Sequence, residues 1–486
     1  MSKKMSYNHI LKYTGIFGSV QVINILASVL RNKAAALLID RYGQGVSELF
    51  NSTINLVSSA TTLIIPVSIV RRISFIYERF DSCSTTIRHE IKIIRSWSVL
   101  TGLFGSILVI LLSSLLSEIT FDSTNHTQSY ILLSPMVLML SINGTEIAIL
   151  KGTRQLKKLV STSVAGSIST LIVCLLCYYI WNLGGIIVSL VVSLAIVSCL
   201  NLHCTIRQYP YKISPFCWRL LSKGKDLIKL SISFLLATLV ASLSEMLIRT
   251  YISHSGSIEN VGLYAAGFAL TVTYTRFIFT AMDADYYPHL SGICNDTGLM
   301  NTAINRQIIV CTQLIVPCLL IFTLFLPTII SILYTSKYLE IVPMVICSSF
   351  YMYTKAIITP IAYTSLAKAD SKMYLIVESI SAVFLCVCVI TGYKYLSLMG
   401  CGIGLTASNL LETILIVSIY RKRYHVNIKR NTIILVLFQL AVLITGILAI
   451  AFMTEHVVIK YLTVLCAVLV SITSSIIILY KNRNKE

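Results

Sequence analysis

Apolar runs of about twenty residues follow one another along the whole chain, and short polar segments separate them. A helix of about 20 apolar residues crosses the hydrocarbon core of a bilayer. The runs are continuous rather than alternating, which favours helices over a transmembrane barrel. The pattern predicts an all-α polytopic membrane protein with fourteen spans, at residues 14–38, 47–70, 97–117, 130–150, 159–181, 184–204, 229–252, 261–283, 307–331, 341–362, 373–393, 400–420, 432–453 and 458–480.

The composition leaves no room for a sizeable soluble domain. Charged residues make up 12% of the 486 residues, about half of what a soluble domain carries. The mean hydropathy is +0.81. The chain is therefore membrane-embedded over most of its length.

The positive charges alternate between loops. Lys and Arg crowd both chain ends and the loops after even-numbered spans, whereas "SEITFDSTNHTQSY" and "SHSGSIEN" contain neither. Cytoplasmic loops of membrane proteins are enriched in these residues, so both termini are predicted to be cytoplasmic. The net charge of +19 is interpreted as this topology signal, with attraction to anionic lipids, and not as a nucleic-acid footprint.

Motifs for other chemistry are missing from the sequence. No Gly-Lys-Ser/Thr loop for ATP and no His/Glu metal motif occurs. Most of the fourteen cysteines lie in apolar runs; Cys174 and Cys177 sit in "LIVCLLCYY", where no cation lowers a thiol pKa. We expect no cofactor, no metal and no enzymatic activity, and we interpret the cysteines as small packing residues.

An internal repeat divides the chain. Lys151 and Lys368, in "AILKGTRQLKKLV" and "SLAKADSKMYLIV", are 217 positions apart, and so are Gly185 and Gly402. Gly45 and Gly262 show the same offset. Six spans return the chain to the same side, which predicts two parallel lobes around a pseudo-twofold axis with a cavity between them. The predicted domains are an N-lobe at 1–206, a basic linker at 207–228, a C-lobe at 229–424 and two further helices within 425–486.

Positive residues at membrane depth are the main candidates for function. In "SVLRNKAAALLID", Arg31 and Lys33 interrupt the first apolar run, and such costly charges usually face a cavity or a partner. Guanidinium groups grip phosphates through paired hydrogen bonds. The predicted cationic cavity for an anionic substrate comprises Arg31, Lys33, Arg249, Arg276 and Lys355.

Alternatives stay open for several of these residues. Lys33 lies about 200° around the helix from Arg31 and can instead extend to the interface. Arg249 follows Glu245 by four residues, which also suits an intrahelical ion pair. The acids Glu245, Asp283, Asp285 and Glu378 are candidates for ion coupling or for structural pairing. Glu146, near Lys151 and Arg154, is a candidate structural partner.

Several segments in chain order carry a family resemblance: "RNKAAALLIDRYGQGVSELFNSTINL", "EMLIRTYIS", "VGLYAAGFAL", "DADYYPHLS" and "LAKADSKMYLIVE". The chain resembles the Wzx-type oligosaccharide translocases of the multidrug/oligosaccharidyl-lipid/polysaccharide exporter superfamily. The resemblance implies a MATE-like flippase in the bacterial inner membrane that moves undecaprenyl-diphosphate-linked repeat units of O-antigen or capsule to the periplasmic leaflet. It also implies membrane lipids and the polysaccharide polymerase machinery as partners.

In this interpretation the diphosphate binds the cationic cavity, and Asn24, Asn55, Tyr264 and Tyr274 assist with the sugar. A murein-precursor flippase is the first alternative, although the Arg-Asp signature of that group after the first span is absent. An organic-cation antiporter on the same scaffold needs acidic residues at the cavity centre. A membrane enzyme usually carries a large external loop or a catalytic acidic motif, and the loops here are short.

Overall fold

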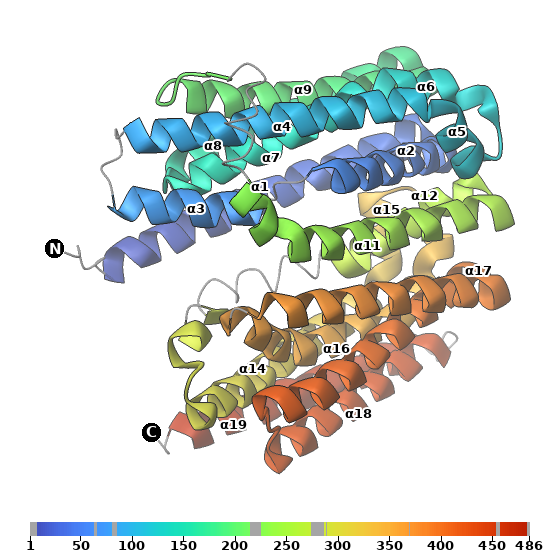
Figure 1. The fold of residues 1–486 in the computed structure, drawn as a ribbon. Helices are drawn as coiled ribbons and strands as arrows, with labels where there is room; N and C mark the ends of the chain where they lie inside the picture. Colours follow the sequence, from blue (N-terminus) through green and yellow to red (C-terminus); the bar gives the residue numbers. More distant parts are fainter. Residues whose placement is uncertain are drawn as a thin grey trace. The chain divides into compact units, whose positions relative to one another are not determined.

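The computed structural model describes residues 7–62, 66–79, 85–213, 225–273, 286–287, 289–368, 370–452 and 457–483. Over these ranges every assigned element is a helix, as Figure 1 shows. The helices are α1 (Tyr7–Leu38), α2 (Asp40–Thr61), α3 (Pro66–Arg79), α4 (Thr85–Leu111), α5 (Ser113–Phe121), η1 (Thr124–His126), α6 (Thr127–Leu133), α7 (Pro135–Gly152), α8 (Leu156–Trp181), η2 (Asn182–Gly184), α9 (Gly185–Ile206), α11 (Lys225–Ser255), α12 (Ile258–Phe268), η3 (Ala269–Thr273), α14 (Thr297–Leu324), α15 (Leu326–Leu333), η4 (Ser336–Ile341), α16 (Val342–Ala367), α17 (Ser371–Tyr424), α18 (Arg430–Phe452) and α19 (Val457–Arg483).

Within the described residues the predicted spans coincide with helices, which confirms the all-α membrane fold. Among the described residues, eight helical stretches are long and apolar enough to cross a membrane. Two of them, Lys157–Ile206 with 50 residues and Ser371–Tyr424 with 54, each hold two predicted spans. Two shorter apolar helices, Ile258–Val272 and Tyr461–Ser474, overlap two further predicted spans. Large apolar side chains such as Leu111, Tyr179 and Ile414 are exposed on the helix surfaces, as expected for contact with lipid.

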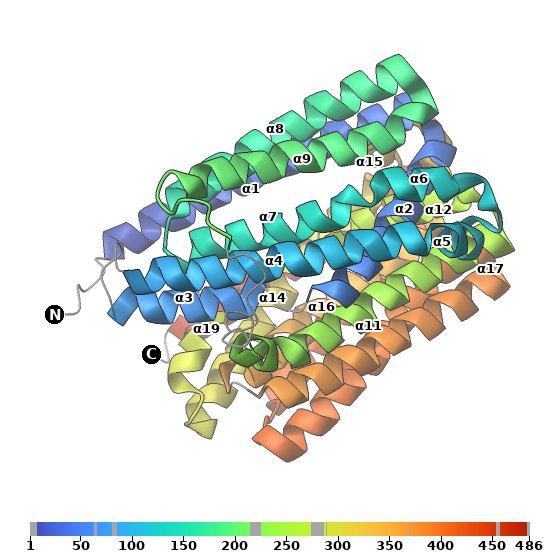
Figure 2. The ribbon, with the colours of Figure 1, turned by 45° about the horizontal axis from the view of Figure 1, so that its top comes forward.

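Each of the two long stretches folds back on itself as an antiparallel hairpin. The turn residues Asn182 and Ser397 have nearly the same backbone angles, φ 48°, ψ −123° and φ 48°, ψ −135°. Beyond the turns, Gly185 packs against the carbonyl of Cys177, and Gly400 packs against the carbonyl of Gly392. Figure 2 shows α8 and α9 running side by side. Equivalent residues are thus 215 positions apart, and the predicted pairing of Gly185 with Gly402 is wrong by two residues.

The turns that precede the two hairpins show the same repeat offset of 215 positions. The amide of Gln155 donates to the carbonyl of Leu150, and the amide of Asp370 donates to the carbonyl of Ser365, again 215 positions on. The repeat is therefore real, but the predicted equivalence of Lys151 and Lys368 is also wrong by two. Two fewer residues separate Gly262 from Ser365 than separate Gly45 from Leu150. The second repeat is therefore two residues shorter in this region, so the offset falls from 217 to 215 positions along the chain.

Asp370 anchors the turn between α16 and α17. Its carboxylate accepts the backbone amide of Met373 at 3.1 Å, two bonds from Arg423 at 2.7 and 2.9 Å, and the hydroxyl of Tyr424 at 2.8 Å. Burial raises the pKa of Asp370, but these hydrogen bonds outweigh it and hold the pKa below its usual value. The motif "LAKADSKMYLIVE" therefore fixes a helix start against the far end of α17.

The chain forms two compact units, Met1–Gly262 and Leu263–Glu486. α11, which the sequence assigns to the C-lobe, packs against α2 and belongs to the first unit. The predicted lobe boundaries at residues 206 and 229 stay predictions, because a unit defined by contacts need not coincide with a repeat. In the second unit α18 and α19 pack on α14, and the hydroxyl of Tyr353 donates to the carbonyl of Val436 at 2.6 Å.

A reciprocal contact joins the repeat-related glycines inside the first unit. A Cβ on Gly45 would collide with the carbonyl of Ile258, and a Cβ on Gly262 would collide with the carbonyl of Arg41. Arg41 and Ile258 are themselves 217 positions apart, as are the two glycines. Contacts in which each segment presents the same residues to the other are typical of a twofold relation. Glycine is needed here because the two backbones approach directly.

Gly45→Ala is therefore expected to destabilise the protein, by about 1–3 kcal/mol, because a backbone carbonyl cannot step aside for the new methyl group. Thermal melting of the purified protein in detergent measures the loss. The matched control is Gly292→Ala, which adds a methyl group where nothing lies within 4 Å. Equal melting temperatures for the two variants would contradict the close backbone contact.

Candidate functional site

A polar pocket of about 310 Å³ lies within the first unit, among α1, α2, α7, α8 and α9. Its polar wall consists of amides, hydroxyls and two charged groups, whereas aliphatic side chains cover the remainder. The polar lining residues are Arg31, Asn32, Gln44, Ser47, Glu48, Asn51, Asn55, Thr170, Cys174, Tyr178, Ser189 and Ser193. An interior lined in this way offers hydrogen bonds to a polar ligand at a depth where lipid offers none.

Arg31 is the cation of this pocket. Its side chain is half-buried in the pocket wall, next to Asn32 and opposite residues of α8 and α9. Within the described residues no carboxylate lies within ion-pair distance of its guanidinium. Lys33, which the sequence also placed in the cationic cavity, is not among the residues that line this pocket. A half-buried arginine that faces a cavity without a carboxylate partner is suited to receive an anion.

Arg249 lies between two carboxylates. Its guanidinium is 3.1 Å from Glu245, one turn earlier on α11, and 3.3 Å from Glu48 on α2. The intrahelical pair that the spacing suggested is thus present, and a second acid joins it. Because Glu48 also lines the polar pocket, Arg249 neutralises one wall of that pocket. Only about 10% of the arginine side chain is exposed, which strengthens both ion pairs.

A second pocket, of about 240 Å³, lies within the second unit between α16 and α17. Lys355 donates to both carboxylate oxygens of Glu412 at 2.9 and 3.0 Å, and its ammonium lies 5.8 Å from the ring centre of Tyr351. Glu378 lines the same pocket. Three tyrosines and two hydroxyl side chains complete its polar wall: Tyr363, Tyr374, Tyr420, Thr359 and Ser365. The predicted cation Lys355 and the predicted acid Glu378 are thus brought together.

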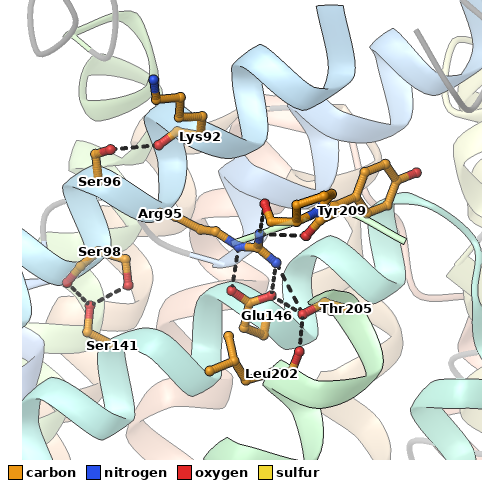
Figure 3. Close-up of polar contacts among 10 residues, drawn as sticks. Lys92, Arg95, Ser96, Ser98, Ser141, Glu146, Leu202, Thr205 and Tyr209 are labelled. Carbon is orange, nitrogen blue, oxygen red and sulfur yellow. Dashed lines mark hydrogen bonds and ion pairs between the residues drawn. The ribbon is translucent and has the colours of Figure 1, made fainter. Parts of the chain in front are cut away.

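A fully buried ion pair in the first unit joins Arg95 to Glu146 (Figure 3). The guanidinium grips both carboxylate oxygens, at 2.7 and 2.8 Å, and each side chain is 1% exposed. The hydroxyl of Thr205 donates to the same carboxylate. Arg95 also donates to the backbone carbonyl of Tyr209 at 2.9 Å. Helices α4, α7 and α9 are therefore connected through one fully buried guanidinium.

Sequence reasoning missed this pair. Residue 95 falls in the basic loop between the predicted spans 47–70 and 97–117, and the sequence offered Lys151 and Arg154 as the neighbours of Glu146. The partner is Arg95, and the structural role expected for Glu146 is correct. One signal was available. Arg95 lies nearly three turns inside α4, directly before the apolar run that the sequence starts at residue 97, where a lone cation needs a partner.

The remaining residues that the sequence proposed for the site lie in several different places. Arg276, Asp283, Asp285 and Tyr274 lie outside the described residues. Asn55 lines the polar pocket. Asn24 bonds to Ser163 and Ser167 and so fastens α1 to α8, whereas Tyr264 is buried beside the ring of Phe268. Within the part of the chain that the structure covers, no group of three His, Cys, Asp or Glu residues could hold a metal ion.

Solved structures with this fold are membrane transporters. The lipid II flippase MurJ in an inward closed conformation is 16% identical, with a TM-score of 0.68 over 97% of this chain and 99% of its own. An inward-facing MATE family multidrug transporter is 13% identical, with a TM-score of 0.67 over 83% and 94%. A transporter from Pyrococcus furiosus, whose binding pocket is described as having reverse polarity, is 13% identical with a TM-score of 0.62 over 85% and 96%.

These similarities show that the chain shares its fold with a MATE transporter and with MurJ, which confirms the MATE-like fold that the sequence resemblance implied. Residues 84–343, more than half of the chain, match the model of a family of polysaccharide biosynthesis proteins. The chain belongs to that family. No curated protein matches the chain by sequence.

Removing one partner of the buried pair is expected to cost far more than removing one partner of an exposed pair. Glu146→Gln leaves the Arg95 charge uncompensated and should destabilise the protein by about 3–5 kcal/mol. The control is Arg72→Ala in the exposed Arg72–Glu90 pair, worth about 1 kcal/mol or less. Unfolding in denaturing detergent measures the free energy of unfolding of both variants. An equal loss of stability in the two would contradict a larger contribution of the buried pair.

Proposed function

We propose that the chain is a flippase that moves an undecaprenyl-diphosphate-linked oligosaccharide, an O-antigen or capsule repeat unit, from the cytoplasmic to the periplasmic leaflet. It is a transporter rather than an enzyme in this proposal. The observation that carries the proposal is Arg31, facing a pocket rich in amides and hydroxyls without a carboxylate partner among the described residues. Membership in a family of polysaccharide biosynthesis proteins points to the sugar-lipid cargo.

The chemistry of the pocket suits both parts of such a head group. The Arg31 guanidinium can donate two parallel hydrogen bonds to a phosphate, and the low dielectric of the interior strengthens them. Amides such as Asn51 and Asn55 pair with sugar hydroxyls as donors and as acceptors. The polyprenyl chain stays in lipid. Rocking of two pseudo-symmetric lobes exposes the head group to each side in turn, with both termini in the cytoplasm.

The pocket of the second unit is proposed to serve coupling or structure. In it Lys355 already has Glu412 as its partner, so a substrate phosphate would have to displace a carboxylate there. A carboxylate such as Glu378 near an ammonium can exchange a proton or a cation as the pocket opens. We therefore assign the phosphate to Arg31 and the possible ion step to Glu378, Glu412 and Lys355.

A murein-precursor flippase is the second candidate. The observation in its favour is that MurJ aligns with 97% of this chain, including the region of α18 and α19, whereas the MATE transporters align with 83–86%. Complementation separates the two cargoes: rescue of a strain depleted of its lipid II flippase supports the murein cargo, and restored surface glycan supports the oligosaccharide. An organic-cation antiporter is disfavoured because Arg31 would repel its substrate.

Arg31→Ala should abolish glycan export while membrane insertion and melting temperature stay unchanged, because the phosphate loses its paired donors. Arg31→Lys should retain partial export, since an ammonium keeps the charge without the planar fork. Immunoblotting of surface glycan in a deletion strain measures export. Lys33→Ala, on the same helix but away from the pocket lining, is the control. Full export by Arg31→Ala would show that Arg31 does not bind the diphosphate in this pocket.

Arg249→Ala should also abolish export, but for a different reason. It leaves Glu48 and Glu245 without their shared guanidinium, so negative charge in the pocket wall repels the diphosphate. The triple variant Arg249→Ala/Glu48→Gln/Glu245→Gln should therefore recover most of the export. If the triple variant stays inactive although it folds and inserts, Arg249 contacts the substrate directly.

A further inference from the structure

A third pocket, of about 270 Å³, lies in the first unit where α4 begins and the segment after α9 passes it. Its lining is strongly basic. The residues are Thr85, Arg88, His89, Ile91, Lys92, Tyr209, Pro210 and Lys212. Three of these eight carry a positive charge, and none of the described lining residues is acidic. The pocket plays no part in the function proposed above.

The three cations have no counterion in the described part of the chain. No carboxylate there lies within ion-pair distance of Arg88, Lys92 or Lys212. The nearest acid in sequence, Glu90, is paired with Arg72 at 3.0 Å. The first turn of α4, a helix of 27 residues, adds partial positive charge from its backbone amides. Like charges gathered around one hollow repel each other unless an anion joins them.

The opposite wall of the pocket is fixed in place. Arg95 donates to the carbonyl of Tyr209 at 2.9 Å and to that of Pro210 at 3.2 Å, and Figure 3 shows this guanidinium held by Glu146. Tyr209 is 2% exposed. The segment that brings Lys212 to Arg88 and Lys92 is thus fastened to a buried ion pair. This distinguishes the pocket from scattered loop cations, which report only topology.

The span predicted from the sequence places this pocket near the lipid head groups. Arg88 and Lys92 fall within the first eight residues of α4, and the predicted span begins only at residue 97. Their side chains are exposed or half-buried, so a ligand can reach them. Basic pockets between helices at a membrane surface bind lipid phosphates.

We propose that this pocket is a binding site for a phosphate group carried by a membrane lipid. Arg88, Lys92 and Lys212 pair with the phosphate oxygens, and the apolar chains extend along the outside of α4. The carrier can be a glycerophospholipid or a polyprenyl phosphate, because both present the same anion at the same depth. The site is distinct from the Arg31 pocket and does not depend on the cargo assigned there.

Titration of the purified protein with phosphatidylglycerol, read by native mass spectrometry, tests the site. The variant Arg88→Gln/Lys92→Gln/Lys212→Gln should bind about tenfold more weakly than the unaltered chain. The control, Lys151→Gln/Lys157→Gln/Arg207→Gln, removes three exposed cations that do not line the pocket and should bind within about twofold of it. Equal weakening of both variants, or binding that never saturates, would overturn the proposal.

Competition identifies the carrier. Displacement of phosphatidylglycerol by undecaprenyl phosphate supports a site that accepts any lipid phosphate, and lack of displacement supports a glycerophospholipid site. Inorganic phosphate that binds as tightly as the lipid would refute lipid as the carrier. Arg31→Ala should leave phosphatidylglycerol binding intact. A negative result for the lipid site can therefore be distinguished from a negative result for the export proposal. If the triple variant does not fold, Arg88→Gln and Lys212→Gln alone should each weaken binding about threefold.

Discussion

A charge at hydrocarbon depth must find a partner or face water, and the polar chemistry of this chain follows from that constraint. Arg95 is gripped by Glu146 with both side chains 1% exposed, Arg249 lies between Glu48 and Glu245, and Lys355 is held by Glu412. Arg31 differs from these three, because a polar pocket takes the place of a carboxylate among the described residues. The exception identifies the candidate site.

The two units carry the same turns but different chemistry. Hairpin turns at Asn182 and Ser397 share their backbone angles, and the turns before them share their hydrogen bonds. The pocket of the first unit, however, combines an arginine with amides, whereas that of the second combines an ion pair with tyrosines. A scaffold shared by drug transporters and lipid flippases does not determine the substrate. The side chains that line the pockets therefore determine it.

The buried Arg95 connects the packing of the helices to the basic pocket. Its bonds to Glu146 join α4 to α7, and its bonds to the backbone after α9 fix the wall of the basic pocket. Replacing such a pair by apolar side chains is often neutral for stability, so its value lies in specifying geometry. Here that geometry places a short basic segment against the start of α4.

The sequence by itself determined the helical membrane fold and the existence of a repeat, because span length and turn glycines are local properties. It left the place of Lys33 open, because the helical period sets Lys33 about 200° around the helix from Arg31. Only the tertiary structure decided which charges meet. Arg95 and Glu146 are 51 positions apart, and Glu48 and Arg249 are 201 apart, so their pairing depends on how helices pack. The two-residue shift of the repeat escaped the sequence for the same reason: a deletion between landmarks leaves each landmark unchanged.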